Sequence, residues 1–393
     1  MIINAILYDP GQPGVTPVEA SFPVKDYDSL YRRLDAEGIG DAVKRDCYIA
    51  DIGCVFDALL TLKGQNVNVD ELDYLAKRLE SFCELEVRQF EGTAAAMGVS
   101  DIESLINLTF CCQQTTVISD FSNLRAIGKE HYLNIHSGGA PVSELDGLNA
   151  ERMARELILN EPGTITPYGV VYCNGMELEQ LYTGQVFPDY LYDQCLFAVN
   201  AKNLSDPDTE STWMYLPMPD VCLERALLRG RLGDPSDISS LDCEMIGLSS
   251  DVFRWADMAC ETPESLNTAA KAIAKLDDND MSKFYAAVQY VEPGSASILC
   301  ELANKMDYFD FYPEVKTAEE YGRHMIMESG HFEYDAELDE FYDFEGYGKQ
   351  RLDNEQGRFL EHGYICYNGN TPLDEIFSAP DRSPGQGMTM GGM

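Results

Sequence analysis

The chain has 393 residues, of which 67 are acidic and 28 are basic, so its formal net charge at pH 7 is −39. Hydrophobic residues make up 45% of the sequence, which is enough for folded cores and excludes a wholly disordered chain. The charge argues against direct binding to nucleic acid or to an anionic membrane, because both surfaces would repel the protein. It favours a basic partner instead.

The distribution of apolar residues and cysteines predicts a cytoplasmic protein. No apolar run approaches the roughly 18 residues that a membrane-spanning helix needs. The opening sequence, MIINAILYD, has no basic leader. The 12 cysteines form no Cys-x-x-Cys pair, and the 5 histidines do not flank them at zinc-finger spacing. We therefore expect reduced thiols and no metal site.

The first half of the chain predicts two strands, then helices, then a closing strand. Residues 3–8 (INAILY) and 18–24 (VEASFPV) are rich in strand-forming residues and are separated by glycine and proline, as in a hairpin. Residues 69–82 place Leu and Phe side chains at steps of three and four, which is typical of an amphipathic helix. A Tyr- and Val-rich stretch then ends at Asn174-Gly175, a turn signal.

The second half of the chain predicts the same order of elements. Strand-like residues 195–199 (CLFAV) and 213–218 (WMYLPM) flank a polar segment. A helix is predicted over residues 262–276, with Thr262 as its N-cap and Pro263 in its first turn. An extended stretch then ends at Asn368-Gly369.

Direct comparison of the two halves predicts an internal duplication. Residues 163–175 (GTITPYGVVYCNG) align with residues 357–369 (GRFLEHGYICYNG) at a spacing of 194, and the same spacing joins Gly128 to Gly322. Three further pairs follow at spacings of 194 to 196, namely Phe22-Pro23 with Leu216-Pro217, Asp46-Cys47 with Asp242-Cys243, and Leu178–Tyr182 with Leu373–Phe377. Matches in one order at nearly constant spacing indicate a repeat.

These elements predict an α+β fold. We expect two tandem elongated units, each with small antiparallel sheet-plus-helix subdomains and a helical middle. The expected domains are residues 1–190, residues 191–378, and a disordered tail at 379–393 that lacks apolar periodicity.

Negative charge is concentrated in one segment of the second copy. Within residues 333–345 there are seven acids and no base, at Glu333, Asp335, Glu337, Asp339, Glu340, Asp343 and Glu345. If this segment is a short helix turning 100° per residue, Leu338, Phe341 and Tyr342 share one face, which we expect to pack inward together with Phe344. Asp339, Glu340 and Asp343 then lie on the opposite face.

Two interpretations of these acids are open. The first is a solvated face on an acid-rich protein. The second is that the carboxylates replace phosphates, because like charges spaced i, i+4 cost a helix about 0.2–0.5 kcal/mol and folding does not require them. Duplex DNA carries one charge per ~1.7 Å, so 39 charges match roughly 66 Å of duplex. The second interpretation is therefore feasible on electrostatic grounds.

Several segments resemble the ArdA antirestriction family. Residues 319–330 (EEYGRHMIMESG), 338–348 (LDEFYDFEGYG) and 361–364 (EHGY) are similar to its C-terminal part. Residues 341–348, FYDFEGYG, closely fit the family pattern (Tyr/Phe)-(Ile/Phe)-Asp-(Tyr/Phe)-x-x-Tyr-Gly, with Tyr342 in place of Ile or Phe at its second position. The opening strands, AILY from Ala5 and ASFPV from Ala20, also resemble that family, and the similarity is strongest over residues 319–377.

The resemblance implies a protein of mobile genetic elements with an anti-defence role as a mimic of B-form DNA. Such proteins occupy the DNA-binding cleft of type I restriction–modification enzymes and inhibit restriction. Members are elongated, acidic α/β proteins that usually dimerise. The resemblance places the antirestriction motif at residues 338–345 and implies a binding protein, not an enzyme, with no cofactor.

The chain departs from the family in two respects. It carries two units where ordinary members carry one. Around the position of the acidic helix, the first copy (residues 143–156, SELDGLNAERMARE) includes two arginines. We therefore expect the second copy to carry the stronger mimic face. We also expect the tandem copies to act as an intramolecular pseudo-dimer, with a homodimer of full chains as the alternative.

Other functions find weaker support in the sequence. With 67 acids, a carboxylate pair of the glycosidase type arises without any separate cue. His324 and His331, with Glu328 between them, fit exposed polar positions better than a metal site. Residues 277–280 (DDND) lack the glycine and the distal glutamate of a calcium loop and predict a connection between helices. An acidic chaperone or binding protein for basic proteins is the alternative function.

Overall fold

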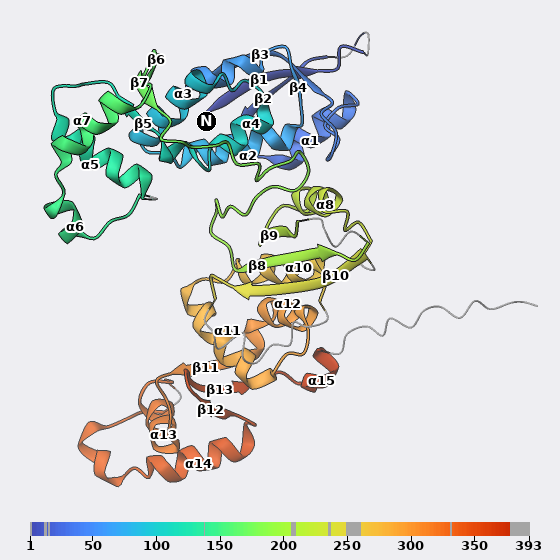
Figure 1. Ribbon diagram of the computed structural model, residues 1–393. Helices are drawn as coiled ribbons and strands as arrows, with labels where there is room; N and C mark the ends of the chain where they lie inside the picture. The colour runs from blue at the N-terminus through green and yellow to red at the C-terminus, as the bar shows by residue number, and fades with distance from the viewer. Residues whose placement is uncertain are drawn as a thin grey trace, which may run out of the picture. The chain divides into compact units, whose positions relative to one another are not determined.

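A computed structural model describes residues 2–11, 14, 16–136, 138–205, 210–234, 237–248, 261–330 and 332–377. It contains many helices and four small sheets, which confirms the predicted α+β fold (Figure 1). The tail that was predicted to be disordered, residues 379–393, lies outside the described residues. Within the described ranges, no helix is both long and apolar enough to cross a membrane.

The chain divides into two compact units whose boundary does not coincide with that of the sequence repeat. Unit 1 contains residues 1–193, 201–213 and 219–240, and unit 2 contains residues 194–200, 214–218 and 241–393. Helix α8 (Asp220–Arg229) therefore belongs to the second copy by sequence but to unit 1 by packing.

The first copy opens with an antiparallel sheet in the order β2-β1-β3-β4. The element bounds are Ile3–Tyr8 (β1), Val18–Phe22 (β2), Tyr27–Ala36 (α1), Cys47–Cys54 (β3) and Asn66–Val67 (β4). Side chains of β1 alternate between buried and exposed positions, so that Ile3, Ala5 and Leu7 face the core of unit 1. The pairing of β1 with β2 confirms the predicted hairpin.

A helical middle and a second small sheet complete the first copy. The predicted helix at 69–82 is α2, whose apolar stripe of Leu72, Leu75 and Leu79 is buried. The middle comprises η1 (Asp57–Leu62), α2 (Val69–Glu80), α3 (Glu84–Met97), α4 (Ile102–Leu108) and η2 (Cys112–Gln114). The closing part comprises β5 (Thr116–Ile118), α5 (Leu124–Ile135), α6 (Val142–Gly147), α7 (Ala150–Asn160), β6 (Thr164–Thr166) and β7 (Gly169–Tyr172).

The second copy repeats this order. Its first elements are β8 (Phe197–Asn203), β9 (Thr212–Leu216), α8 and β10 (Ile238–Met245). Its middle comprises α10 (Pro263–Ile273), α11 (Asp278–Val291), α12 (Ala296–Asn304) and η4 (Met306–Tyr308). Its last elements are β11 (Phe309–Pro313), α13 (Ala318–Met327), η5 (Ala336–Phe341), α14 (Phe344–Asn354), β12 (Arg358–Leu360), β13 (Gly363–Tyr367) and α15 (Leu373–Ile376). The sheet order β11-β13-β12 matches β5-β7-β6.

Equivalent helices in the two copies begin at positions 194 residues apart. Helices α3 and α11 share both bounds at this spacing, and so do α6 and η5. Side chains that cap helix N-termini recur in the pairs Asn68 and Thr262, Asp101 and Ser295, Asn123 and Thr317, and Asn149 and Asp343. Because each cap bonds only to the first turn of its own helix, the sequence sets these boundaries locally in each copy.

A close helix crossing also recurs in both copies. A Cβ atom on Gly128 in α5 would lie 1.8 Å from the carbonyl oxygen of Ala150 in α7. A Cβ atom on Gly322 in α13 would lie 1.9 Å from the carbonyl oxygen of Phe344 in α14. Both distances are far inside van der Waals contact, so only glycine permits these helices to approach so closely. This explains why the two glycines stood out in the sequence comparison.

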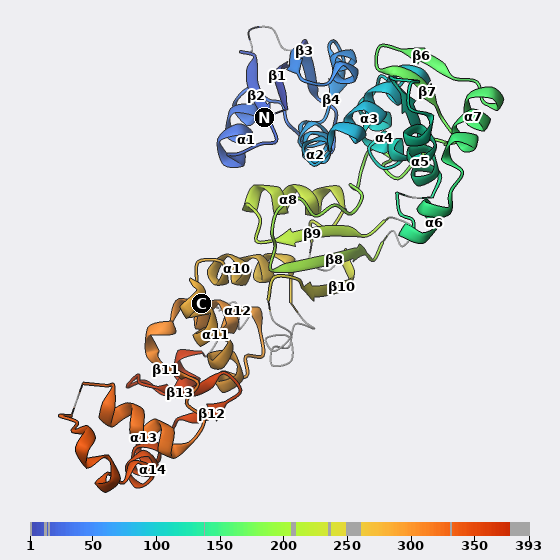
Figure 2. The same ribbon diagram turned by 90° about the vertical axis from the view of Figure 1, so that its left-hand side faces the viewer.

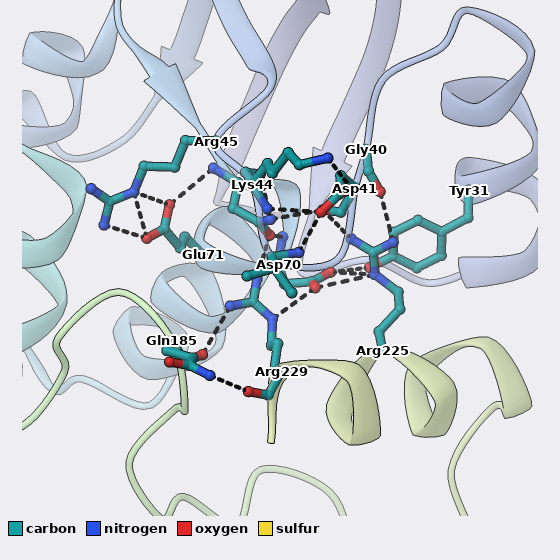
Figure 3. A network of polar contacts seen from close by, with 12 residues as sticks. Tyr31, Gly40, Asp41, Lys44, Arg45, Asp70, Glu71, Gln185, Arg225 and Arg229 are labelled. Carbon is teal, nitrogen blue, oxygen red and sulfur yellow. Dashed lines mark hydrogen bonds and ion pairs between the residues drawn. The ribbon is translucent and has the colours of Figure 1, made fainter. Parts of the chain in front are cut away.

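A buried polar network holds α8 against the first copy (Figure 3). The Nε atoms of Arg225 and Arg229 donate to the carboxylate of Asp70 at 3.0 and 3.1 Å. Arg225 also donates from Nη1 to the carbonyl oxygen of Gly40 at 2.7 Å, and its guanidinium lies 4.1 Å from the ring centroid of Tyr31. Both guanidinium groups are therefore compensated by charge and by hydrogen bonds, as buried cations must be.

A second carboxylate extends the network. Glu71 is fully buried, and it accepts hydrogen bonds from Arg45 and from the Tyr182 hydroxyl, which lies 2.9 Å away. Tyr182 belongs to the segment between β7 and β8, and Asn107 bonds to both its backbone N–H and its carbonyl. This segment is thus fixed along α2 and α4, and the network has a structural role.

Candidate functional site

The acidic segment lies between two packed helices of unit 2. Helices α13 and α14 cross at Gly322 and lie on one side of the sheet β11-β13-β12 (Figure 2). Thr317 caps α13, and Tyr321 and Met325 from α13 enter the buried cluster beneath the sheet. The packed helices α13 and α14 therefore hold the two ends of the acidic segment.

The expectation of one short helix through residues 338–343 is wrong. The chain forms a 3-10 helix, η5, that ends at Phe341, and α14 begins at Phe344. The Asp343 carboxylate caps α14 by accepting a hydrogen bond from the N–H of Gly346 at 2.8 Å. An N-cap residue has non-helical backbone angles, here φ −87° and ψ 75°, so the helix cannot run through it. Asp339, Glu340 and Asp343 consequently do not share one helix face.

The expected packing of the apolar residues is correct for only part of the set. Phe344 is buried under the guanidinium of Arg323, 4.2 Å from its ring centroid, and Tyr342 is half-buried beside it. Leu338 and Phe341 are 47% and 82% exposed, so the prediction that they pack inward is wrong. In a 3-10 helix residues i and i+3 eclipse each other, which places these two side chains together on the solvent side of η5.

Six of the seven acids are exposed to solvent, and Asp339 is half-buried. Asp335 caps η5 through the N–H of Glu337, Asp343 caps α14, and Glu345 pairs with Lys349. Among the residues that the structure describes, the carboxylates of Glu333, Glu337 and Glu340 form no hydrogen bond or ion pair. These three carboxylates are available to a partner.

Asp339 joins η5 to α13. Its Oδ1 atom lies 3.3 Å from Nη1 of Arg323 and accepts a hydrogen bond from the Tyr334 hydroxyl at 2.7 Å. The hydrogen bond to the Asp339 carboxylate raises the pKa of Tyr334. Neither Arg323 nor Tyr334 was among the predicted site residues. Residues 301–347 contain only three bases, and Arg323 is one of them. This scarcity of bases was the only feature of the sequence that pointed to Arg323.

The first copy shows which of these acids the fold requires. Asn149 caps α7 in the first copy as Asp343 caps α14 in the second, by accepting from Arg152 N at 3.2 Å. The position of Asp335, which precedes η5, is held by Pro141 before α6. Residues 139–151 contain three acids where residues 333–345 contain seven. The same order of elements therefore forms with fewer than half of these carboxylates.

No group of three His, Cys, Asp or Glu side chains in the described ranges could hold a metal ion. His324 Nδ1 lies 3.0 Å from Glu328 in an i, i+4 pair, and His331 lies outside the described residues. Asp277 of the DDND segment caps α11 by accepting from the N–H groups of Asn279 and Asp280. That segment thus serves as a helix start.

No family model matches the chain, and no curated protein shows significant similarity to it.

Proposed function

We propose that this protein is a DNA-mimic antirestriction protein. In this proposal the protein occupies the DNA-binding cleft of a type I restriction–modification enzyme and inhibits it without catalysis. The proposal combines the family resemblance of residues 319–377 with one observation on the acidic segment. Seven acids occupy thirteen positions, six are exposed, and the corresponding segment of the first copy forms helices with equivalent bounds although it has only three acids.

Electrostatics supports this choice of partner. A DNA-binding cleft presents Lys and Arg side chains to phosphates, and about half to two-thirds of protein–DNA hydrogen bonds go to the backbone. The carboxylates of Glu333, Glu337 and Glu340 form no ion pair in the described ranges, so none has to be broken when they bind in such a cleft. Complementary charge also speeds association and makes it sensitive to salt.

The proposal assigns one chain to one enzyme cleft. Because the chain already contains both copies, we expect a monomer that acts as a pseudo-dimer. Multi-angle light scattering of the purified protein measures this directly, and a stable dimer of full chains would contradict it.

The decisive experiment neutralises the three carboxylates that form no hydrogen bond or ion pair in the described part of the chain. We expect the combined change Glu333→Gln, Glu337→Gln and Glu340→Gln to raise the concentration needed for half-inhibition of plasmid cleavage by a type I enzyme. Three exposed charge pairs, at about 0.2–1 kcal/mol each, correspond to roughly 3- to 150-fold. The triple change should not lower the melting temperature, because these carboxylates form no hydrogen bond or ion pair within the described residues and their mutual repulsion is removed.

Two matched controls accompany this triple variant. Asp343→Asn places in the second copy the capping residue that the first copy uses, so the variant should keep the fold. It should raise the concentration needed for half-inhibition by less than the triple change does. Neutralising Glu144, Asp146 and Glu151 in the first copy removes the same number of charges from the equivalent segment. If that variant loses as much inhibition as the triple variant, net charge and not the acidic segment determines binding.

Competition with DNA separates the proposal from an acidic chaperone. Unlabelled duplex should displace the protein from the enzyme, because both occupy one cleft. A chaperone for basic proteins would instead bind histone-like proteins regardless of duplex. Full inhibition by the triple variant at physiological salt would refute the assignment of the binding surface.

A further inference from the structure

Unit 1 contains a cavity of about 310 Å³ that the sequence did not predict. It lies between η1, the C-terminal half of α3 and the turn that joins β6 to β7. Its apolar lining is Ala58, Ala94, Ala95, Val99 and Pro167. Its volume is at the lower end of the range for small-molecule sites, about 300–1,000 Å³.

The polar lining of the cavity is acidic. Glu91 on α3 is only 3% exposed, and its Oε2 accepts a hydrogen bond from the N–H of Ala58 at 3.0 Å. The hydroxyl of Tyr168 donates to Oδ2 of Asp57 at 2.8 Å. Burial raises the pKa of Glu91. The cavity therefore joins an apolar wall to two carboxylates and contains no cationic side chain in its lining.

The end of α3 adds partial negative charge to the same place. Helix α3 stops at Gly98, which adopts a left-handed conformation with φ 69°, and Gly98, Val99 and Ser100 line the cavity. The last carbonyl groups of a helix carry the negative end of its dipole, which favours cations. Both the side chains and the backbone thus favour a positively charged group.

The second copy shows that a helix with the bounds of α3 does not need a carboxylate at the position of Glu91 in order to form. Tyr285 of α11 corresponds to Glu91, and His362 corresponds to Tyr168, at the spacing of 194. The rings of Tyr285 and His362 lie 5.9 Å apart. Helices α3 and α11 have equivalent bounds, so the helix forms equally well with an aromatic residue at this position. Burying a carboxylate costs free energy, and a cation that pairs with Glu91 would offset part of that cost.

We infer that this cavity binds an organic cation, with a guanidinium or primary ammonium group paired to Glu91 and Asp57. An apolar stem of the ligand then lies against Ala94, Val99 and Pro167. The cation has two possible sources, namely an arginine or lysine side chain of a protein partner and a free small amine. The inference concerns the first copy and does not depend on the proposed DNA mimicry.

Calorimetric titration of the full chain with butylguanidinium tests this inference. Butylurea is the matched control ligand, since it has the same shape without the charge. We expect butylguanidinium to bind, butylurea not to bind, and Glu91→Gln to weaken butylguanidinium binding by about tenfold or more, because a charged hydrogen-bonded pair is lost. Glu91→Tyr, which copies the second repeat, should abolish binding with the fold intact.

A control variant separates this site from general attraction to an acidic protein. Glu151→Gln removes one exposed carboxylate from α7 and should leave butylguanidinium binding unchanged at 0.15 M salt, roughly the ionic strength at which the Debye length is about 8 Å. Equal binding by wild type and Glu91→Gln, equal binding of butylurea, or no binding of butylguanidinium would each overturn the inference.

A third ligand distinguishes the two sources of the cation. N-acetylarginine methylamide carries backbone groups on its stem, as a side chain of a protein partner does. If it binds as tightly as butylguanidinium and depends on Glu91, the cavity accepts a protein side chain. If only butylguanidinium binds, the ligand is a free small amine.

Discussion

Asp343 and Asn149 begin equivalent helices with the same hydrogen bond, yet only Asp343 carries a charge. Glu91 and Tyr285 occupy equivalent positions on α3 and α11, and again only one carries a charge. At the scale of single residues, comparison of equivalent positions in the two copies therefore separates side chains that the helices need from side chains that they only tolerate. Charged residues in the second class are the natural candidates for contacts with partners.

The raised pKa of Glu91 predicts how stability depends on pH. Its folded-state pKa lies above the ordinary value of 4.5 because burial disfavours the charged form. The neutral form therefore stabilises the fold below pH 4.5, and this contribution is lost as the pH rises through the folded pKa. We expect Glu91→Gln to be more stable than wild type at pH 7 and equal to it at pH 4.

Thermal unfolding of both proteins at pH 4 and pH 7 checks this expectation. A difference in melting temperature that stays constant across this range would show that Glu91 does not titrate as a buried group. Glu151→Gln serves as the comparison, since Glu151 is exposed on α7.

At the scale of elements, two helix pairs depend on glycine at one crossing point. Gly322 in α13 and Gly128 in α5 each face a backbone carbonyl of the helix that they cross. A backbone atom cannot move aside as the end of a flexible side chain can. The acidic segment follows α13 in the chain and runs into α14. The crossing of these two helices therefore fixes the position of the proposed binding surface.

We expect Gly322→Ala to lower the free energy of unfolding by about 3 kcal/mol, because overpacking at a backbone contact forces the helices apart. Gly294→Ala is the matched control, since nothing lies within 4 Å of the position of its Cβ. Urea unfolding followed by circular dichroism measures both variants. Equal stability of the two would refute the argument from close approach.

The packing of helix α8 on the first copy gives a second prediction about secondary-structure elements. Asp70 compensates both Arg225 and Arg229, which are 9% and 3% exposed. Asp70→Asn leaves two buried guanidinium groups without their counter-charge and should cost about 3–5 kcal/mol. Asp28→Asn, at an exposed position on α1, should cost little. Urea unfolding tests the pair, and near-equal midpoints would show that the network contributes little.

At the scale of the whole molecule, the net charge of −39 opposes compaction. Repulsion between exposed charges extends over about 30 Å at 0.01 M salt but only about 10 Å at 0.1 M. We therefore expect the melting temperature to rise between these two salt concentrations. Inhibition of a restriction enzyme should weaken over a similar rise in salt, because the attraction between protein and cleft is screened by the same ions.

The proposal therefore predicts opposite responses of stability and inhibition to salt. Differential scanning calorimetry measures the first, and a cleavage assay measures the second. A melting temperature that is independent of salt would show that the acids lie too far apart to repel one another.

The sequence predicted the local parts of this protein well. The N-cap at Thr262, the helix at α2 and the β1–β2 hairpin depend on residues close together in the chain, and the structure has them. The side-chain arrangement of the acidic segment was only partly predictable. The periodicity suggested a helix through Asp343, but the capping bond to Gly346 ended it there.

The sequence by itself determined the net charge, the duplication at a spacing of 194 and the cluster of acids at 333–345. Through its capping residues it also determined where most helices begin. Only the tertiary structure decided that Asp339 is held by Arg323 and that Phe341 is exposed. It alone brought Asp57, Glu91 and Tyr168 around one cavity. The physical reason is the distance along the chain over which each interaction acts. Helix caps and turns involve residues within one helical turn, whereas burial and ion pairing depend on segments that only folding brings together.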